Sequence, residues 1–443
     1  MKFKDTIMNL EFFNKKQKYN FFLCLDIGTE AVKAIILKKE RLEGESNKKI
    51  IVLGNSKEYF NKSGIFDNTE FQKDILKKAI SKAIKSVAIQ SDIKQKFALY
   101  NPYSKNLKLN KKYKNLDETI LLSLPASFLK TRIVSRLLKR KEIDKKISKI
   151  EAKSINQKVL KDVKIKVSEE FAQEFGILPQ DIKIVSIKFI EKKVDGYAVP
   201  KLQNYKGKVL EFRILITFLP RNYLRSITEI IKDLRVEASP ILGSSKNKIK
   251  KTFDQNLSRF ISEKVKITYS YQNLSTLQKV DDSAVFLDIG GEITQIFLVR
   301  KGNLYKTGEF KIGGRVFSQS LSEAFGIEEY RARELKKRYS KKLLNPESAE
   351  KIKEILESQN NAWLKGFKSE IRKMNMGKIF PTNIFIFGGA SQLPEIEKSL
   401  HRAKDIVKEI KFILPKDFTN IEDVTNNLKT SQSVPCLLTS YSI

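Results

Sequence analysis

Two short segments of the chain share a pattern of residue types that suits phosphate binding. Their sequences are LDIGTE at residues 25–30 and LDIGGE at residues 287–292. Glycine at a tight turn lets backbone N–H groups approach a phosphate closely, and a neighbouring aspartate can hold a metal ion or a water molecule. The aspartate and the glycines of each copy are therefore candidate binding residues.

The residues on either side of both copies predict a β-hairpin. FFLCL and AVKAIIL enclose the first copy, and AVFL and ITQIFLV enclose the second. Short apolar runs bounded by glycine are typical of strands that a tight turn connects. Two equivalent hairpins at distant positions indicate a fold built from two similar lobes.

A third segment predicts a strand that ends in glycine. IFIFGGASQLPEIEKSL at residues 384–400 begins with apolar residues, turns at two glycines and continues with a pattern typical of a helix. If this strand end and the two hairpins belong to one site, Gly28, Gly290 and Gly389 should surround a common cavity.

Length and the content of metal-binding residues restrict the fold and the chemistry. A chain of 443 residues is too long for one core and suits two lobes of roughly 150–200 residues with smaller subdomains. The only cysteines are Cys24 and Cys436 and the only histidine is His401, which argues against zinc sites and histidine-based catalysis. Cys24 lies in an apolar run, where a small buried thiol is the simplest interpretation.

The sequence shows neither a membrane span nor a secretion signal. No stretch approaches the roughly 18 consecutive apolar residues of a spanning helix. The N-terminal sequence MKFKDTIMNLEFF carries charged residues and lacks the apolar core of a signal peptide. We therefore expect a cytoplasmic protein. Residues 1–19 could form a weak interfacial helix, and a tail or a strap over the first lobe is the alternative.

The net charge of +34 suits a partner with an anionic surface, such as nucleic acid or anionic lipid. Lysines are spread along nearly the whole chain, so most of them are expected on solvated faces. The local concentrations are KNLKLNKKYK (105–114), LLKRKEIDKKISK (137–149), KNKIKK (246–251) and LKKRYSKK (335–342). These runs lack interleaved base-stacking aromatic residues, so no specific nucleic-acid partner is expected.

The three glycine-bearing segments, in this order, resemble the phosphate-one, phosphate-two and adenosine motifs of the actin-like ATPase superfamily. Residues 168–220 resemble a stretch of FtsA in which an inserted subdomain returns to the first lobe, and residues 310–327 resemble the segment after phosphate two. These stretches narrow the resemblance to the branch that holds the cell-division protein FtsA and the type IV pilus protein PilM. The resemblance implies an α/β chain with a two-lobed actin-like (ribonuclease H-like) fold and an inserted small α+β subdomain.

This resemblance also implies a division of the chain. The expected parts are an N-terminal extension at 1–19, the first lobe at 20–118 and 208–242, the inserted FtsA-type subdomain at 119–207, and the second lobe at 243–443. The second lobe would contain a helical excursion at 317–376 and the closing elements of the fold. Residues 120–135, ILLSLPASFLKTRIVS, are expected as one strand of the inserted subdomain.

The resemblance implies that ATP and Mg²⁺ bind in the cleft between the lobes. Asp26 and Asp288 would hold the metal ion. The residues that match the nucleotide-binding motifs are Asp26, Gly28, Thr29, Lys33, Asp288, Gly290, Gly291, Thr294, Lys336, Gly388, Gly389 and Ser391.

Several positions depart from the family pattern. Glu30 stands where a small hydroxyl residue is usual, Glu292 replaces a glycine, and Arg333 takes the place of a glutamate. A carboxylate about 5 Å from a phosphate, at an effective dielectric constant near 20, opposes binding by about 3 kcal/mol unless it points away. The other differences are Ile293, Phe387 and Glu395. We therefore expect ATP binding with weak or no ATPase activity.

Three classes of function remain open: an actin-like scaffold with two possible roles, an enzyme, and a basic binding protein. The first choice is an FtsA-like scaffold that binds ATP, self-associates into a polymer and recruits partners in cell division, because of the inserted subdomain and the length. A PilM-like role in type IV pilus assembly follows closely. A small-molecule kinase is less favoured because it needs an aspartate base and a substrate pocket that no further segment indicates. A basic lipid-binding or nucleic-acid-binding protein comes last.

Association with the inner face of the membrane is a further expectation. FtsA proteins generally end in an amphipathic helix that attaches them to the membrane, and this sequence shows no counterpart. The expected partners are therefore a membrane protein or a tubulin-like division protein. An anionic membrane surface could assist, since each nearby Lys or Arg contributes about 1 kcal/mol to the attraction.

Overall fold

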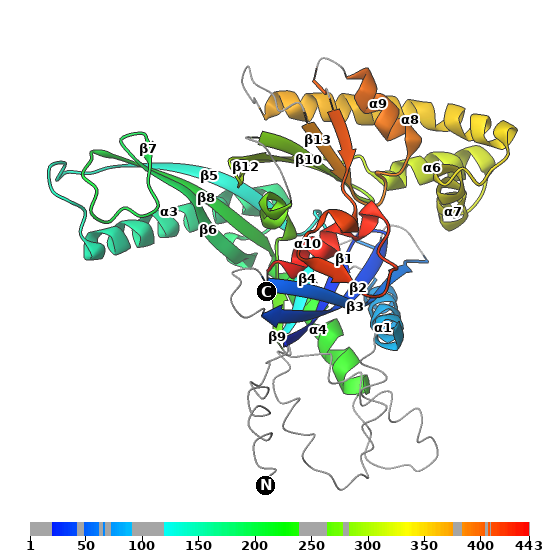
Figure 1. Ribbon diagram of the computed structural model, residues 1–443, viewed down its shortest axis with the longest axis horizontal. Coiled ribbons are helices and arrows are strands. Elements are labelled where there is room, and N and C mark those ends of the chain that lie inside the picture. Colours follow the sequence, from blue (N-terminus) through cyan, green and yellow to red (C-terminus); the bar gives the residue numbers. More distant parts are fainter. Residues whose placement is uncertain are drawn as a thin grey trace, which may run out of the picture.

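The computed structural model describes residues 20–41, 48–61, 65–66, 72–90, 119–238, 264–277, 283–374, 383–403, 406–407 and 409–442. Three of the predicted features lie outside these ranges: the N-terminal extension and the basic runs at 105–114 and 246–251. Figure 1 shows three sheets with their helices, arranged around the point where the two lobes meet. None of the helices in the described ranges has the length and apolar character needed to cross a membrane.

The first lobe is built on a six-stranded sheet. Its strands, in spatial order, are β15 (Ile421–Asp423), β3 (Lys48–Tyr59), β2 (Ala31–Arg41), β1 (Asn20–Ile27), β4 (Thr119–Ser123) and β9 (Lys264–Ile267). β1 and β2 form the predicted antiparallel hairpin, and β4 pairs with β1 in parallel. The continuous apolar sequence of β1 follows from burial on both faces of the sheet, as in other sheets that are covered on two sides.

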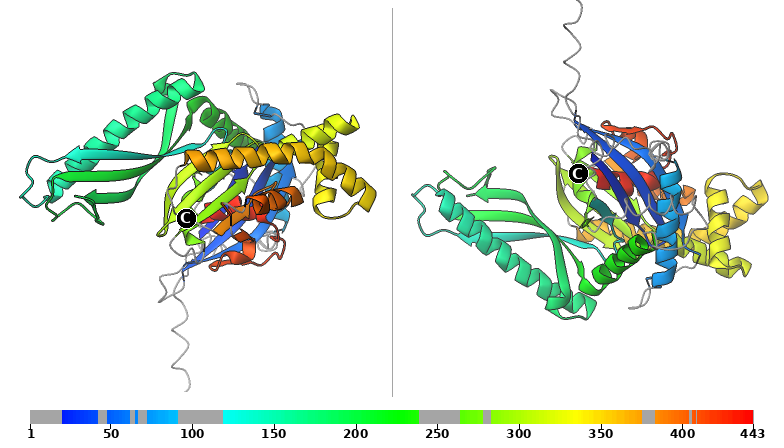
Figure 2. Two further views of the ribbon diagram at one scale, coloured as in Figure 1. Left: turned by 90° about the horizontal axis from the view of Figure 1, so that it is seen from above. Right: turned by 90° about the horizontal axis from the view of Figure 1, so that it is seen from below.

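Helices cover both faces of this first sheet. α1 (Lys73–Gln90) packs on β2 and β3, and α4 (Arg221–Ala238) packs against α1. The short helix α10 (Val434–Ser440) contacts β1, β2 and β4. The view from below in Figure 2 shows α1 and α4 beneath the strands. Segments from both ends of the described chain therefore complete one lobe.

The second lobe repeats the hairpin arrangement on a five-stranded sheet. Its strands, in spatial order, are β12 (Asn303–Phe310), β11 (Thr294–Arg300), β10 (Ser283–Ile289), β13 (Asn383–Phe387) and β14 (Glu409–Phe412). The helices of this lobe are α6 (Gly314–Phe325), α7 (Glu329–Ser340), α8 (Pro346–Lys373) and α9 (Pro394–Arg402). Figure 2 shows α8 lying across the sheet in the view from above. As in the first lobe, an antiparallel hairpin is followed by a parallel neighbour, here β13.

Alternate residues of β10 serve two different cores. Val285 and Leu287 pack with the helices of the second lobe. Ala284 and Phe286 belong to the core of the first lobe. Since successive side chains of a strand point to opposite faces, the sheet of the second lobe lies between its own helices and the first lobe. The two lobes therefore share a continuous apolar contact.

A third, four-stranded sheet forms the inserted part. Its order is β5 (Lys130–Lys139), β8 (Val209–Pro220), β6 (Ile182–Val194) and β7 (Tyr197–Ala198), and α3 (Lys149–Phe175) packs on it. The strand pairing differs from the expected division. β4, expected in the inserted part, pairs in the first lobe, whereas β8, expected in the first lobe, pairs here. β4 ends at Ser123, and a turn begins at Pro125, where proline lacks the N–H that further strand pairing would need.

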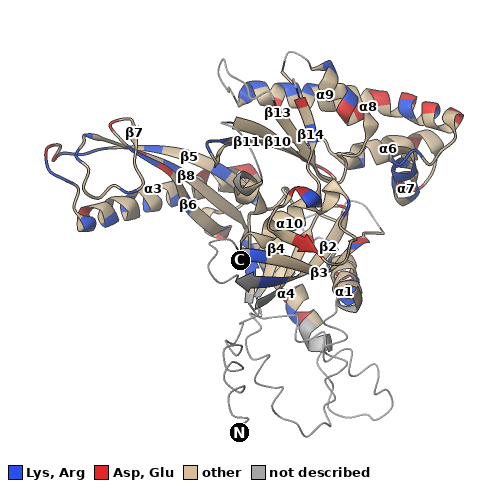
Figure 3. Cartoon of the chain, viewed as in Figure 1, with Lys and Arg blue, Asp and Glu red and all other residues tan. Residues whose placement is uncertain are grey.

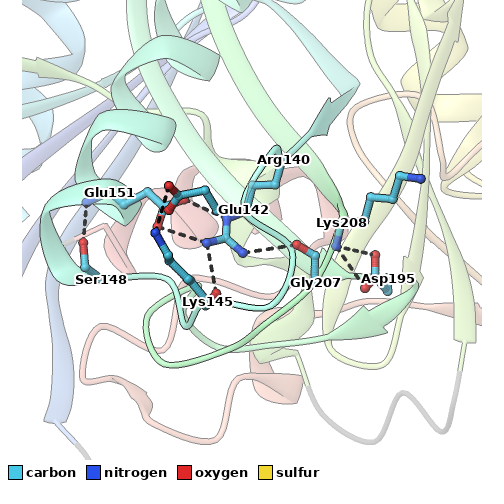
Figure 4. A network of polar contacts seen from close by, with 8 residues as sticks. All are labelled: Arg140, Glu142, Lys145, Ser148, Glu151, Asp195, Gly207 and Lys208. Carbon is cyan, nitrogen blue, oxygen red and sulfur yellow. Dashed lines mark hydrogen bonds and ion pairs between the residues drawn. The ribbon is translucent and has the colours of Figure 1, made fainter.

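Polar contacts hold the outer end of the inserted part together (Figure 4). Arg140, directly after β5, donates to both carboxylate oxygens of Glu151 in α3, at 2.7 and 3.2 Å. The same guanidinium donates to the carbonyl of Gly207, just before β8, at 3.2 Å. Ser148 caps α3 by accepting the N–H of Glu151 at 3.1 Å. A single buried arginine thus connects β5, α3 and the approach to β8.

The positive charge is distributed over the whole molecule. Figure 3 shows Lys and Arg on helices and strands of all three parts, with Asp and Glu between them. The run at 335–342 lies on and just after α7, beside the interface between the lobes. Part of the basic charge therefore lies close to the candidate site.

Candidate functional site

The two LDIG turns face one cavity where the lobes meet. The N–H of Gly28 donates to the carbonyl of Ala31 at 2.9 Å, and the N–H of Gly290 donates to that of Ile293 at 3.0 Å. Gly28, Gly290 and Gly389 all line the same cavity, which confirms the predicted convergence of the three glycine-bearing segments. The turns have the same backbone hydrogen bond, so the sequence repeat is also a repeat in structure.

The cavity brings together most of the predicted binding residues. Those that line it are Asp26, Gly28, Thr29, Lys33, Asp288, Gly290, Gly291, Lys336, Gly388 and Gly389. The cavity encloses about 160 Å³, whereas pockets that hold small molecules commonly measure roughly 300–1,000 Å³. The cavity is smaller than a typical small-molecule pocket, so a nucleotide needs the lobes to separate further.

The other two predicted residues, Thr294 and Ser391, are not among the residues that line the cavity. The Thr294 hydroxyl donates to the carbonyl of Ile312 at 2.7 Å and accepts from Nε1 of Trp363 at 2.9 Å. The Ser391 hydroxyl donates to the carbonyl of Gly388 at 2.9 Å. Both residues are fully buried, so their hydroxyl groups stabilise the second lobe and the glycine turn.

Two glycines are required by close approach. Gly388 has a φ of +100°, and a Cβ atom there would overlap Oδ1 of Asp288. A Cβ atom on Gly291 would overlap Oγ1 of Thr29 in the opposite lobe. Only a residue without a side chain fits either position. The second contact also shows that the LDIG turns of the two lobes (residues 25–30 and 287–292) touch each other.

The aspartate of the first loop forms an ion pair. Nζ of Lys33 lies 2.7 Å from Oδ2 of Asp26, and the two residues are directly opposite in the β1–β2 register. Burial alone would lower the pKa of Lys33, but the Asp26 carboxylate outweighs it and raises that pKa. The lysine therefore stays charged inside the cleft.

The aspartate of the second loop has a different environment. Oδ2 of Asp288 accepts a hydrogen bond from the hydroxyl of Tyr271. Burial raises the pKa of Asp288 to about 6, and the nearby Asp26 carboxylate adds to the shift, although Tyr271 and Lys33 oppose it. Two buried carboxylates thus share one cavity, and a cation between them would relieve their repulsion.

The metal-binding side chains near these aspartates suit only one mode of metal binding. In the part of the chain that the structure describes, no group of three or more His, Cys, Asp or Glu side chains could hold a metal ion. Mg²⁺ is commonly held by one or two carboxylates together with phosphate oxygens and water. Asp26 and Asp288 fit this mode, in which the ligand supplies part of the coordination.

The departures from the family pattern are paired with arginines. Oε2 of Glu30 lies 3.0 Å from NH1 of Arg333, which belongs to α7 of the other lobe. Oε1 of Glu292 lies 3.2 Å from NH1 of Arg315, in α6 of the same lobe. Each carboxylate has a cationic partner, which reduces the repulsion that an isolated carboxylate would exert on a phosphate.

Several lining residues were not foreseen from the sequence. They are Lys57, Tyr59, Tyr271, Lys337 and Gln432. Lys57 lies directly opposite Lys33 in the β2–β3 register, so the strand pattern could have found it once that register was known. Tyr271 and Gln432 lie in short 3-10 helices or beside them, where no periodic pattern identifies them.

Two of the lining lysines are partly buried and have no carboxylate partner among the described residues. Lys57 donates to the side-chain amide oxygen of Gln432, and Lys336 donates to the carbonyl of Gly314. Within the described ranges, neither ammonium group makes an ion pair. Burial lowers the pKa of Lys57 to about 6, and the charges of Lys33 and Lys337 add to this shift. Burial likewise lowers the pKa of Lys336 to about 8.

Comparisons with known proteins agree with the resemblance found in the sequence. Residues 285–433 match the family model described as cell division protein FtsA. Over the whole chain, the fold is similar to the structure of the PilM-PilN type IV pilus biogenesis complex, with a TM-score of 0.59 and 11% sequence identity. That similarity covers 95% of this chain and 97% of the other. The family match and the shared fold confirm the predicted actin-like ATPase architecture.

Other solved structures are less similar. Ethanolamine utilization protein EutJ from Carboxydothermus hydrogenoformans has a TM-score of 0.43 at 10% identity, over 95% of this chain and 89% of that one. MreB5 of Spiroplasma citri bound to ADP has a TM-score of 0.38 at 11% identity, over 96% and 95%. Scores this low carry no argument about function. No curated protein matches the sequence.

Proposed function

We propose that this chain, which has the actin-like ATPase fold of the FtsA and PilM branch, is a scaffold that binds ATP between its two lobes. The observation that carries the proposal is the meeting of two equivalent glycine turns and a third, Gly388–Gly389, at one cavity. Backbone N–H groups of such turns bind phosphate oxygens. Nucleotide binding would then set the separation of the lobes and, through it, self-association.

The charges in the cavity support an anionic ligand. Lys57 and Lys336 are partly buried lysines whose pKa values are lowered and which have no carboxylate partner among the described residues, so a bound polyphosphate would favour the charged form of both. Lys33 adds a charged lysine beside the two aspartates. Asp26 and Asp288 would hold Mg²⁺ together with the phosphates. When bound, the metal ion neutralises charge on the phosphate oxygens.

Calorimetric titration with ATP and Mg²⁺ at physiological salt tests the proposal. We expect Asp288→Ala to weaken binding the most, by about tenfold or more, because it removes a candidate metal ligand. Thr294→Val is the matched control, since Thr294 lies nearby in the second hairpin but outside the cavity wall. Equal affinities of the parent protein and the Asp288 variant, or no binding by the parent, would show that the loops do not bind nucleotide.

Hydrolysis is expected to be slow. The loops carry Glu30 and Glu292 where the family pattern has smaller residues, and both carboxylates are held by arginines. Release of phosphate at several turnovers per second would contradict this part of the proposal and favour a genuine enzyme.

Within the scaffold function, a role in cell division is our first choice. The match of residues 285–433 to the FtsA family model supports it. The fold shared with PilM makes a cytoplasmic role in type IV pilus assembly the alternative. A fluorescent fusion together with a deletion strain separates the two. Mid-cell rings and failure to divide support the first role, whereas loss of surface pili with normal division supports the second.

The proposed place of action is the inner face of the cytoplasmic membrane, reached through a membrane-protein partner and assisted by the positive charge. Such attraction to an anionic surface is non-specific and weakens as salt rises. Sedimentation with anionic and neutral vesicles over a salt series, with and without residues 1–19, tests it. Salt-resistant binding that depends on residues 1–19 would indicate an amphipathic anchor in place of a partner.

A further inference from the structure

The ion pair between Glu30 and Arg333 joins the two lobes beside the cavity. Glu30 follows β1 in the first lobe, and Arg333 lies in α7 of the second. Their side chains are largely buried, with 18% of Glu30 and 9% of Arg333 exposed. Both residues line the cavity that the proposed nucleotide would occupy.

Arg333 makes further contacts with the first lobe. Its NH2 group donates to the carbonyl of Phe60 at 2.7 Å. Its guanidinium lies 5.0 Å from the ring centre of Tyr59, and Nζ of Lys337, one turn further along α7, lies 3.3 Å from the same ring. One face of α7 is therefore attached to the end of β3, close to the two LDIG turns.

The ion pair between Glu30 and Arg333 leaves two buried polar atoms without a hydrogen bond. Oε1 of Glu30 and Nε of Arg333 are buried, and neither has a hydrogen-bond partner among the described residues. A guanidinium can form two parallel bonds with a carboxylate or a phosphate, so its open Nε donor leaves capacity for another anion. A buried ion pair with unused donors and acceptors stabilises the arrangement of the lobes in which it forms less than a fully hydrogen-bonded pair would. The geometry thus suits a contact that can open.

We propose that Glu30 and Arg333 form a latch that holds the two lobes together, in which the Glu30 carboxylate occupies a place on Arg333 that an anionic group of the ligand takes when the lobes open. This inference rests on the proposed nucleotide binding. Glu30 acts as a built-in competitor of the ligand. The small volume of the cavity and the contact between Gly291 and Thr29 are those of the latched state.

The two partners of the latch are predicted to affect affinity in opposite directions. Glu30→Gln removes the competing charge, so we expect ATP to bind about tenfold more tightly. Arg333→Gln removes a cation and leaves Glu30 unpaired inside the cleft, so ATP should bind about tenfold more weakly. An ion pair that merely stabilised the fold would not give opposite signs.

Hydrogen exchange of the nucleotide-free protein measures the latch without any ligand. Both variants should raise the exchange of backbone amides in residues 27–31 and 329–340, because the lobes separate more often. Glu292→Gln is the matched control, since the partner of Glu292 is Arg315 in its own lobe. That variant should leave exchange at residues 27–31 unchanged. The charge exchange Glu30→Arg with Arg333→Glu should restore protection, and it keeps the test valid if a single variant folds poorly.

The two measurements separate this inference from the proposed function. Unchanged exchange in both single variants would refute the latch even if ATP binds. Increased exchange in a protein that binds no ATP would retain the latch and refute the nucleotide site. Equal loss of affinity in both variants would assign the pair to ligand binding and overturn the role of Glu30 as a competitor.

Discussion

The two hairpins of this protein have the same sequence pattern and the same backbone, yet their aspartates are in different chemical environments. Asp26 lies opposite Lys33 in its hairpin, and Asp288 lies opposite Gln295 in the other. The lysine forms an ion pair with its aspartate, whereas Asp288 relies on a tyrosine from outside the hairpin. The cross-strand residue therefore decides whether the aspartate of the shared loop has a lysine as its partner.

The glutamates that follow the two turns differ in a similar way. Glu30 pairs across the cleft with Arg333, whereas Glu292 pairs within its own lobe with Arg315. The first pair depends on the separation of the lobes, and the second does not. Two copies of a motif can thus keep the same backbone while their side chains do different things: Glu30 joins the two lobes, and Glu292 stabilises its own lobe.

The largest effect is expected from making the first hairpin resemble the second. Lys33→Gln leaves the Asp26 carboxylate buried without its partner, since only 9% of that side chain is exposed. Removing one member of a buried pair commonly costs about 3 kcal/mol or more of unfolding free energy. Urea unfolding of the nucleotide-free protein measures this loss.

The double variant Asp26→Asn with Lys33→Gln should recover most of that stability, because neither charge then remains buried alone. If the Lys33→Gln variant is as stable as the parent, the ion pair of Asp26 with Lys33 does not distinguish the first hairpin from the second.

The glycine turn beside Asp288 gives the next largest effect. In Gly388→Ala, the backbone at φ +100° is strained and the new Cβ atom meets the carboxylate of Asp288. We expect a loss of about 2 kcal/mol of unfolding free energy and weaker ATP binding. Gly389→Ala is the control, because a Cβ atom there meets nothing within 4 Å. Similar melting temperatures for both variants would contradict the role of this close approach.

A smaller effect is expected from the strand that follows each turn. Thr294 and Val32 occupy equivalent positions in the registers of the two hairpins. Thr294→Val leaves Nε1 of Trp363 without its acceptor, so we expect a loss of about 1 kcal/mol of unfolding free energy. ATP affinity should not change. A tenfold weaker affinity would return Thr294 to the set of binding residues.

The smallest effect concerns Lys57, whose pKa is lowered to about 6 by burial and by neighbouring cations. Between pH 6 and the ordinary range of lysine, the unfolded chain holds a proton that the folded protein lacks, so raising the pH stabilises the fold. Lys57→Met should raise the midpoint of thermal unfolding by about 2 °C near pH 6. This gain should shrink towards pH 9. A gain that does not depend on pH would show that the lysine is not desolvated.

The sequence was sufficient to predict the parts of the site that depend on local structure. Each turn was predictable because glycine and alternating apolar residues specify a hairpin within about a dozen residues. The side chains that complete the site were harder to predict. Tyr271 and Lys57 reach the cavity because of how distant elements pack and pair, which a local sequence pattern does not encode.

The same reason explains the differences in strand pairing. β4 and β5 are close in sequence and were expected as one strand, but the turn after Pro125 sends them into different sheets. The partner of a strand is a non-local property, set by which apolar face it can bury. Likewise, Glu30 and Arg333 were each recognised as departures from the family pattern, but their contact became evident only in three dimensions.

The pairing of β15 with β3 has a consequence for the order in which the molecule folds. Ile421 lies beside Ile50 in this parallel pair, and Asn55 bonds to Thr425, 370 positions away along the chain. Contacts this distant in sequence form late and slowly. During synthesis, the edge of β3 therefore stays open until residues 421–440 have left the ribosome. Over that interval the nascent first lobe exposes a strand edge and an apolar face, the surfaces that chaperones protect from aggregation.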